Sequence, residues 1–293
     1  EVIINEILYD MLKNYSSNRD VTRELQLSND RTYFTSISSV TNNKRMVGKV
    51  CLLRDITHFR VLDTLKTDVV ATVSHDLRSP LTFMKGYVSL LTVVGQLNDQ
   101  QKSYVEKIEA GIASMTKLVN NLLDLGRIEA GIGQSIEKIS PNLIIDQIIS
   151  GLQPTATQKN ILLTFVEPDC KDLLIDADPE LLQQAIFNLV DNAIKYTNLG
   201  GKIEVILTSK DGKALIEIRD TGIGIAPIDL PHLFDKFYRS SRRESYKNRG
   251  SGLGLAIVKT IAERHFGRVW VESKLGRGSS FYLEIPIEHP KTS

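Results

Sequence analysis

The sequence predicts a multidomain α and α/β protein, and the hydrophobic patterning of three stretches supports that prediction. Residues 57–133 carry apolar side chains at helical spacing without strand-like alternation, which predicts a helical hairpin. In residues 134–293 helical and alternating segments follow one another, an order typical of a two-layer α/β sandwich. Residues 1–56 add a short β-rich segment. A chain of 293 residues has room for about two full domains, which agrees with this division.

The net charge and the absence of long apolar runs argue against a nucleic-acid or membrane partner. The chain has 36 Lys and Arg against 35 Asp and Glu, a formal net charge of +1, so no overall field favours nucleic acid or an anionic membrane surface. No apolar run approaches the roughly 18 to 20 residues that span a bilayer, and no signal peptide opens the chain. We expect a cytoplasmic protein without a nucleic-acid partner, attached to a membrane only through a segment upstream of Glu1, if any.

The N-terminal segment is expected to contain a short helix and three strands. Apolar side chains recur at helical spacing in residues 2–12, and residues 22–27, 32–41 and 46–54 alternate in β fashion between turn-like sequences. The segment closes with Asp55-Ile56-Thr57 and resembles the last three strands and the exit of a PAS domain. It is too short for a whole domain of that kind, so we expect a partial sensory segment.

Two long helices are expected in the middle of the chain. Thr57 is a plausible N-cap for the first, a break at residues 95–99 separates the two, and Gly131 and Gly133 close the second. Apolar residues repeat every seven positions along the second helix: Ile108, Met115 and Leu122, with Gly111, Leu118 and Leu125 between them. A heptad seam on a hairpin indicates that two chains pair into a dimeric four-helix bundle. A monomeric hairpin packed on its own chain is the alternative.

The C-terminal part reads as a separate domain that follows a linker at residues 134–140. Helices are expected at residues 141–158, 179–196 and 253–265, and strands at residues 161–166, 202–208, 214–219, 268–273 and 279–287. Together these elements predict helices beside a mixed, largely antiparallel sheet.

Two glycine-containing stretches in this domain are candidates for binding a ligand. Asp220-Thr-Gly222-Ile-Gly224 follows a strand directly, and its glycines would let the backbone approach a flat ring or a phosphate. Gly250-Ser-Gly252-Leu-Gly254-Leu255 opens a helix, where free N–H groups and the helix dipole favour phosphate. Each motif alone is weak, since a strand that ends in a glycine turn is common.

Asn188 and Asn192 are four residues apart on one predicted helix and therefore share a face, with Lys195 just short of the next turn. Magnesium takes oxygen ligands and keeps several waters, so two amide oxygens beside phosphates would suit it. A solvated helix face is the alternative for such a pair.

Taken together and in order, four motifs resemble the nucleotide-binding boxes of the GHKL (Bergerat) ATP-binding fold. They are Asn188-Leu-Val-Asp-Asn192-Ala-Ile-Lys195-Tyr196, Asp220-Thr-Gly-Ile-Gly, Phe234-Asp-Lys-Phe237-Tyr-Arg239 and Gly250-Ser-Gly-Leu-Gly. With Ser74-His75-Asp76-Leu77-Arg78-Ser79-Pro80-Leu81 upstream on the helical hairpin, the chain resembles a sensor histidine kinase of two-component signalling. The resemblance covers roughly residues 58–288.

The resemblance implies a role for each matching residue of the ATP-binding domain. Asp220 would accept the exocyclic amino group of adenine, and Asn188 and Asn192 would hold Mg²⁺. Residues 226–250 would form a mobile lid. The remaining expected contacts with ATP are Lys195 and Arg239 on phosphates, Tyr196 at the border of the nucleotide, Phe237 and Leu255, and Gly222, Gly224, Gly250, Gly252 and Gly254 in the two glycine boxes. Phe234 and Phe237 would anchor the start of the lid.

The resemblance also gives His75 a chemical role. It would be the phosphoacceptor, with Asp76 orienting and deprotonating the ring, and the phosphoryl group would pass to an aspartate of a response regulator. Ser79 stands where related kinases carry a residue that helps dephosphorylate the partner, so phosphatase activity is left open. Pro80 cannot donate the hydrogen bond that the Asp76 carbonyl would receive, which predicts a bend one turn after His75.

Two other functions are alternatives to a kinase. ATPases of the chaperone or mismatch-repair kind carry a glutamate four residues before the metal-binding asparagine, where this chain has Asn188, which cannot act as a base. A scaffold that binds nucleotide without phosphorylating would not need His75, Asn192, Asp220 and the three glycines of the second glycine box together. Both observations favour a kinase.

Overall fold

The computed structural model describes residues 21–26, 31–42, 45–131, 135–166, 173–240 and 251–288. The chain divides into two compact units, one of Glu1–Val69 with Lys291–Ser293 and one of Val70–Pro290. The helix predicted at residues 2–12 lies outside the described residues, and the domain boundaries at 56/57 and 133/134 stay predictions. Within the described residues no helix has the length and apolarity needed to cross a bilayer.

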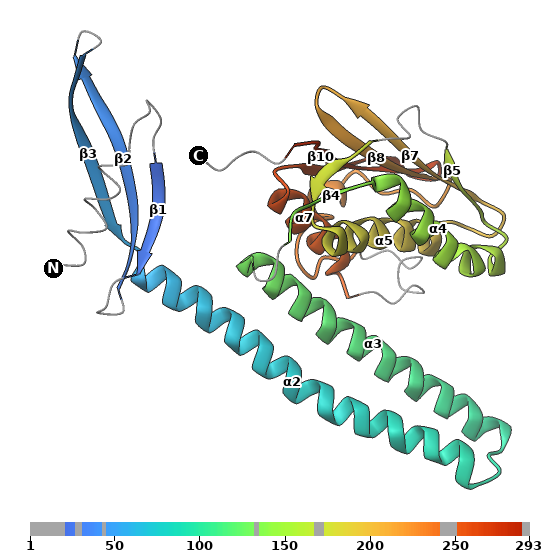
Figure 1. Cartoon of the computed structure of the whole chain (residues 1–293). Helices are drawn as coiled ribbons and strands as arrows, with labels where there is room; N and C mark the ends of the chain where they lie inside the picture. The colour runs from blue at the N-terminus through green and yellow to red at the C-terminus, as the bar shows by residue number, and fades with distance from the viewer. Residues whose placement is uncertain are drawn as a thin grey trace. The chain divides into compact units, whose positions relative to one another are not determined.

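The first unit contains a three-stranded antiparallel sheet, drawn in blue in Figure 1. Its strands are β1 (Val21–Gln26), β2 (Thr32–Asn42) and β3 (Arg45–Asp55), paired in the order β1-β2-β3. The three alternating runs of the sequence are thereby confirmed as strands. The likeness to a PAS domain stays a prediction, because three strands alone do not define that fold.

Helix α2 (Thr57–Val94) begins directly after β3. The carboxylate of Asp55 accepts hydrogen bonds from the Thr57 N–H (2.9 Å) and the Thr57 hydroxyl (2.6 Å), and the hydroxyl bond is the main reason that the pKa of Asp55 is lowered. The expectation that Thr57 caps the helix is therefore wrong, because Asp55 supplies the acceptor and Thr57 is the first helical residue. The helix continues through Pro80, and the bend expected there stays a prediction.

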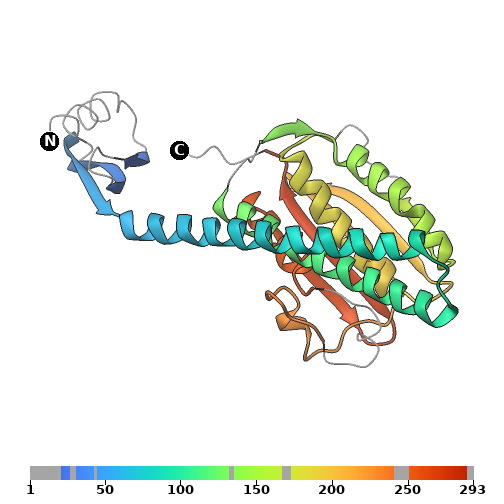
Figure 2. The same cartoon turned by 90° about the horizontal axis from the view of Figure 1, so that it is seen from below.

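Helix α3 (Asp99–Ala130) runs back beside α2, as Figure 2 shows. Asn98 caps it with a capping box, in which Asn98 Oδ1 accepts the Gln101 N–H (2.8 Å) and Gln101 Oε1 accepts the Asn98 N–H (2.9 Å). Gly131 ends the helix in the left-handed conformation, with φ 68°. The break at residues 95–99 and the end at Gly131 are confirmed, whereas Gly133 lies outside the described residues.

The core of the hairpin is made by another face of α3 than the heptad seam expected to pair two chains. Leu81 and Val88 of α2 pack with Val105, Ile112 and Val119 of α3, which also repeat every seven residues. The heptad residues singled out in the sequence point elsewhere, since Ile108 and Met115 are 47% and 46% exposed. These two residues of the expected seam are not used by the hairpin core, and the pairing of two chains through them stays a prediction.

The second unit also contains a five-stranded sheet in the order β5-β7-β8-β10-β9. Only β5 and β7 are parallel, so the sheet is mixed and largely antiparallel as predicted. Its strands are β5 (Leu162–Val166), β7 (Lys202–Lys210), β8 (Lys213–Asp220), β9 (Arg268–Lys274) and β10 (Gly278–Pro286). The helices that pack beside it are α4 (Pro141–Gln158), α5 (Pro179–Tyr196) and α7 (Gly254–Arg264).

A second, two-stranded sheet was missed in the sequence. β4 (Glu137–Ile139) pairs antiparallel with β6 (Ile175–Ala177). The first of these strands lies in the stretch expected to be a linker. Each strand has three residues, which is too short for an alternating pattern to be recognised.

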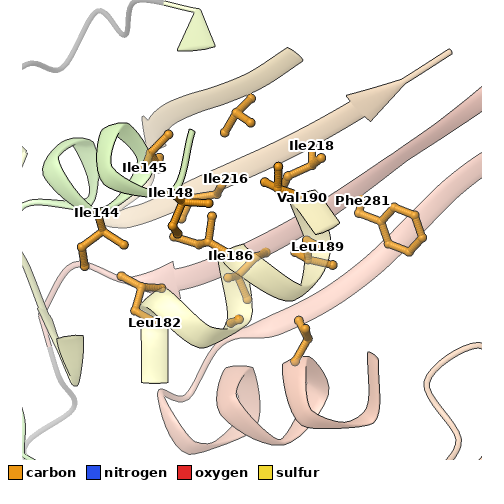
Figure 3. Packing of buried hydrophobic residues seen from close by; sticks show 14 of the residues in the cluster. Ile144, Ile145, Ile148, Leu182, Ile186, Leu189, Val190, Ile216, Ile218 and Phe281 are labelled. Atoms are coloured by element: carbon orange, nitrogen blue, oxygen red, sulfur yellow. The ribbon is translucent and has the colours of Figure 1, made fainter. Parts of the chain in front are cut away.

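The core of this domain lies between the helices and the sheet (Figure 3). Ile145, Leu182 and Ile186 from the helices and Ile216 and Ile218 from the sheet are fully buried. The same cluster includes Leu125 and Ile128 of α3, so the C-terminal turns of the hairpin are part of this core.

A buried histidine joins α5 to α7. His265, which is 1% exposed, accepts the Asp178 N–H on Nε2 (3.0 Å), so its Nδ1 carries the proton that bonds the Ile261 carbonyl (2.8 Å). Asp178 in turn caps α5 by accepting the Leu181 N–H (3.0 Å). The start of α5 is thereby fixed against the end of α7.

Candidate functional site

The second unit contains a cavity of about 580 Å³, a size within the range of small-ligand sites. It is bounded by α5, by the turn after β8, by the start of α7 and by one face of α3. The structure brings together on its walls most of the ligand-binding residues expected from the sequence: Asn188, Asn192, Lys195, Tyr196, Asp220, Gly224, Arg239, Gly252, Gly254 and Leu255. Gly222 and Phe237 lie outside this lining, and Gly250 lies outside the described residues.

Asp220, at the end of β8, is a buried carboxyl of the cavity wall, only 7% exposed. Its Oδ1 accepts the Gly222 N–H at 2.8 Å. Burial raises the pKa of Asp220, and backbone hydrogen bonds from Gly222 and Ser279 partly oppose that rise. A buried acceptor held in place by backbone donors is suited to recognising a donor group on a ligand.

The glycines after Asp220 are required by the protein's own backbone. A Cβ on Gly222 would lie 2.4 Å from the Tyr196 carbonyl oxygen, and one on Gly224 would lie 2.2 Å from the Lys274 carbonyl oxygen. The expectation that both glycines make room for a ring or a phosphate is therefore incomplete. They let the turn pack against the end of α5 and against β9, and that packing shapes the cavity wall.

Helix α5 presents Asn188, Asn192 and Lys195 to the cavity, together with Asp191, which the sequence reasoning passed over. Asp191 forms an ion pair with Lys195 one turn later and accepts Lys117 Nζ at 3.2 Å. Its spacing of four residues from Lys195 was the signal that could have identified it. The cavity therefore holds two lysines around one carboxylate, directly beside the two asparagines.

The donor set fits a magnesium ion held only in part by protein. Amide oxygens of Asn188 and Asn192 can reach the cavity, and hard oxygen donors are what Mg²⁺ prefers. Across the part of the chain that the structure describes, no three His, Cys, Asp or Glu side chains gather as a metal cluster. A magnesium ion here would complete its shell with phosphate oxygens and water.

The described start of the expected lid is tied down by polar contacts. Asp229 accepts hydrogen bonds from the Tyr238 hydroxyl (2.7 Å) and the Ser240 hydroxyl (2.8 Å). Arg239, between Tyr238 and Ser240, lines the cavity with Tyr196. Burial raises the pKa of Tyr196, and the positive charge of Arg239 opposes that rise. The hydrogen bonds of Tyr238 and Ser240 fix the chain on both sides of Arg239.

The two lid phenylalanines differ in how they are held. Phe234 packs partly buried against the core, as expected. Phe237 has an exposed ring (59%), and its N–H donates to the Gly252 carbonyl at 3.0 Å. Phe237 thus attaches the start of the lid to the second glycine box through its backbone and not through its ring. The basic residues Arg242, Arg243, Lys247 and Arg249 lie outside the described residues.

The predicted phosphoacceptor stretch lies on α2. His75 is within the helix, but its side chain lies outside the described part, so its geometry with Asp76 stays a prediction. Asp76 and Ser79 are exposed, and neither lines the cavity. Arg78 Nη2 lies 3.4 Å from Asn120 Oδ1 of α3 and links the two helices at this level.

Helix α3 contributes a wall of the cavity that the sequence reasoning did not foresee. The residues are Ala110, Ala113, Ser114, Lys117 and Asn121, at the spacing of one helix face. Asp124, one turn further, accepts Gln184 Nε2 of α5 at 2.8 Å. Glu129 pairs with Lys236, and the Glu129 carbonyl accepts a hydrogen bond from Arg264 of α7. No sequence pattern pointed to these contacts.

Comparison with known families identifies two domains in the chain. Residues 65–131 match the His Kinase A (phospho-acceptor) domain, and residues 177–289 match the histidine kinase-, DNA gyrase B- and HSP90-like ATPase. The first match contains His75, and the second contains the cavity residues of α5, β8 and α7.

The chain is also similar to individual sensor proteins and histidine kinases. The chain is 30% identical over 286 residues to Sensor protein SrrB of Staphylococcus aureus (strain N315), which covers 96% of this chain and 48% of SrrB. The chain thus spans about half the length of the curated relatives it matches. Among solved structures, full-length ShkA in complex with AMPPNP is 30% identical with a TM-score of 0.64, over 75% of this chain and 45% of ShkA. Histidine kinase ThkA in complex with the response regulator TrrA is 21% identical with a TM-score of 0.58, over 98% of this chain and 84% of that one, and supports the fold.

Proposed function

Because the chain belongs to the sensor histidine kinases, with a phospho-acceptor hairpin followed by an ATP-binding domain, we propose that it phosphorylates itself on His75 from ATP. The phosphoryl group would then pass to an aspartate of a response regulator. The observation that carries this proposal is the cavity in which Asp220, Asn192 and Lys195 converge. A hydrogen-bond acceptor for a base, oxygen ligands for a metal and a cation for phosphates are there combined in one site.

Each end of the cavity suits one end of ATP. The buried Asp220 carboxylate would accept the exocyclic amino group of adenine, which selects adenine over guanine. Lys195 and Arg239 would face the phosphates, and Asn188 and Asn192 would hold Mg²⁺, which supplies charge neutralisation on the phosphate oxygens. Ser251, Gly252 and Gly254 lie at the start of α7, where backbone N–H groups can bind phosphate.

The transfer needs a nucleophile and a proton acceptor. One ring nitrogen of neutral His75 would form a bond to the γ-phosphorus, while the bond from that phosphorus to the bridging oxygen breaks and ADP leaves. The proton on the other ring nitrogen would pass to Asp76, the next residue in the sequence. In the second step an aspartate of the receiver domain would take the phosphoryl group from the phosphohistidine, with Ser79 a candidate for assisting its later hydrolysis.

The residue at position 188 argues against an ATPase driven by hydrolysis. Asn188 occupies the position at which chaperone-type ATPases carry the glutamate that activates water, and an amide cannot accept that proton. If hydrolysis is slow, bound ATP remains available to phosphorylate His75.

The hairpin has apolar faces left for a second copy of the chain. Leu77, Met84 and Leu91 on α2 are 45%, 41% and 53% exposed and repeat every seven residues. Ile108 and Met115 on α3 show the same spacing and similar exposure. Exposed heptad stripes on both helices support a homodimeric four-helix bundle. Because ATP and a receiver partner are cytoplasmic, we place the reaction in the cytoplasm.

Incubation with γ-labelled ATP tests the proposal. We expect label on the wild-type chain that is lost in acid, as phosphohistidine requires, and no label on His75→Gln. Label that is absent from the wild type, that survives acid, or that persists in His75→Gln would contradict a histidine autokinase. Sedimentation at micromolar concentration checks the dimer, and a monomer there would argue against the bundle.

A further inference from the structure

We propose that Lys117, on helix α3 of the phospho-acceptor hairpin, is a phosphate-binding residue of the nucleotide site. This inference rests on the proposed function, since it names a further ligand contact in the same cavity. Lys117 lines that cavity together with Asn188 and Asn192, the asparagines expected to hold magnesium. Its Nζ lies 3.2 Å from Oδ2 of Asp191, the residue before Asn192 on α5. The hairpin thus places a cation at the phosphate end of a site built mainly by the other domain.

The charges at this end of the cavity favour an anionic ligand. Lys117 and Lys195 both contact the single carboxylate of Asp191, which leaves one positive charge in excess in this group of three. Asp191 is only 18% exposed on its side chain, so this charge lies in a region partly shielded from water. A polyphosphate entering beside Asn188 and Asn192 would meet both lysines at once.

A second contact on the same face of α3 points to the same end of the cavity. Asn121 is four residues after Lys117, and its Nδ2 donates to Ser251 Oγ at 3.2 Å. Ser251 lies in the second glycine box, just before α7, whose start is the other phosphate-binding element of the site. Lys117 and Asn121 therefore hold α3 against the two segments expected to contact phosphate.

The remaining cavity residues of α3 explain how a nucleotide can fit beside the helix. This face of α3 carries the small residues Ala110, Ala113 and Ser114, which leave room for a ligand in the cavity of about 580 Å³. The pair between Lys117 and Asp191 adds little stability of its own, because the Lys117 side chain is 54% exposed. Its position is better explained by a ligand that uses the same cation.

The experiment compares two ligands on the full chain by calorimetry. AMPPNP with Mg²⁺ carries the phosphates, and adenosine lacks them. For Lys117→Met we expect the affinity for Mg-AMPPNP to fall about tenfold, as befits one lost charged hydrogen bond, while the affinity for adenosine changes less than about twofold. Lys117→Arg keeps the charge and should bind Mg-AMPPNP within about threefold of the wild type.

Lys107→Met is the matched control. Lys107 is on the same helix, but it lies over the Tyr104 ring and does not line the cavity, so both affinities should equal those of the wild type. Wild-type affinity of Lys117→Met for Mg-AMPPNP would overturn the inference. An equal loss for adenosine and Mg-AMPPNP would do so too, since it would mean that Lys117 only positions α3. A wild-type chain that binds neither ligand would instead contradict the proposed function itself.

Discussion

The Asp220 carboxylate accepts the backbone N–H of Gly222, two residues later, at 2.8 Å, and this bond holds a buried acid at the cavity wall. The geometry depends on Gly222 having no side chain, because a Cβ there would meet the Tyr196 carbonyl oxygen. Asp220, the turn after it and the end of α5 therefore form one unit, and a change in any of the three should alter the affinity for the ligand.

Replacing Asp220 with Asn tests its role in recognising adenine. The amide keeps one acceptor oxygen but introduces a donor, so we expect the affinity for Mg-AMPPNP to fall about 10- to 100-fold, the range for a lost hydrogen bond to a charged group. Calorimetry measures this fall. Asp211→Asn is the control, since Asp211 lies at the β7–β8 turn away from the cavity, and its φ of 53° suits Asn. Unchanged affinity in Asp220→Asn would refute the assignment.

Asn192→Ala should abolish autophosphorylation and leave the hairpin dimer intact. The substitution removes an oxygen ligand from the expected magnesium site but lies in α5, away from the exposed heptad residues of α2 and α3. Labelling from γ-labelled ATP measures the first effect and sedimentation the second. Asn198→Ala, just after α5 and exposed, should label as the wild type does. Normal labelling of Asn192→Ala would show that this side chain is dispensable.

Asp124 should make the stability of the chain depend on pH. Burial is the main cause that raises its pKa in the folded state above the ordinary value of about 3.9. The unfolded chain therefore releases the Asp124 proton at a lower pH than the folded chain does. As a result, the free energy of unfolding falls as pH rises from about 4, a penalty that levels off once the carboxyl of the folded state has also ionised.

Asp124→Asn removes that penalty and can still accept the Gln184 hydrogen bond. We expect it to raise the free energy of unfolding at pH 7 by less than about 1 kcal/mol, because the side chain is only partly shielded from water. The gain should vanish near pH 3. Urea titrations at several pH values measure it, with the exposed Glu109→Gln of α3 as control. A gain that is equal at pH 3 and pH 7 would contradict this account.

Ile186 tests the core beneath the site. It is fully buried between α5 and the sheet, so Ile186→Ala should lower the free energy of unfolding by about 2 to 5 kcal/mol. Leu199→Ala, at a residue that is 76% exposed, should change it by less than about 0.5 kcal/mol. Chemical denaturation gives both values, and similar losses for the two variants would mean that α5 is not packed as described.

The sequence was sufficient for those elements whose pattern is long or whose motif is local. Helices α4 and α5 begin and end where periodicity predicted, and the cavity unites Asn192, Asp220 and Gly252, which are far apart in the chain. Strands β4 and β6 were missed because three residues carry no readable period.

What could not be predicted are the contacts that form only when α3 meets the ATP-binding domain. Lys117 and Asn121 look like ordinary surface residues of a helix, and nothing local indicates that Asp191 and Ser251 face them. The face of α3 that closes the hairpin was left unidentified for a related reason. Val105 and Ile112 repeat every seven residues, as Ile108 and Met115 do, and periodicity does not say which set closes the hairpin.

Leu125 and Ile128 stabilise the attachment of α3 to the ATP-binding domain. Both are at most 5% exposed within the core of the ATP-binding domain. A movement that lifted that domain off α3 would expose both side chains to water, at a cost of about 1.5 to 3 kcal/mol each. An input that separates the domain from α3 would therefore have to overcome this apolar cost, which is set by the two side chains and not by the nucleotide.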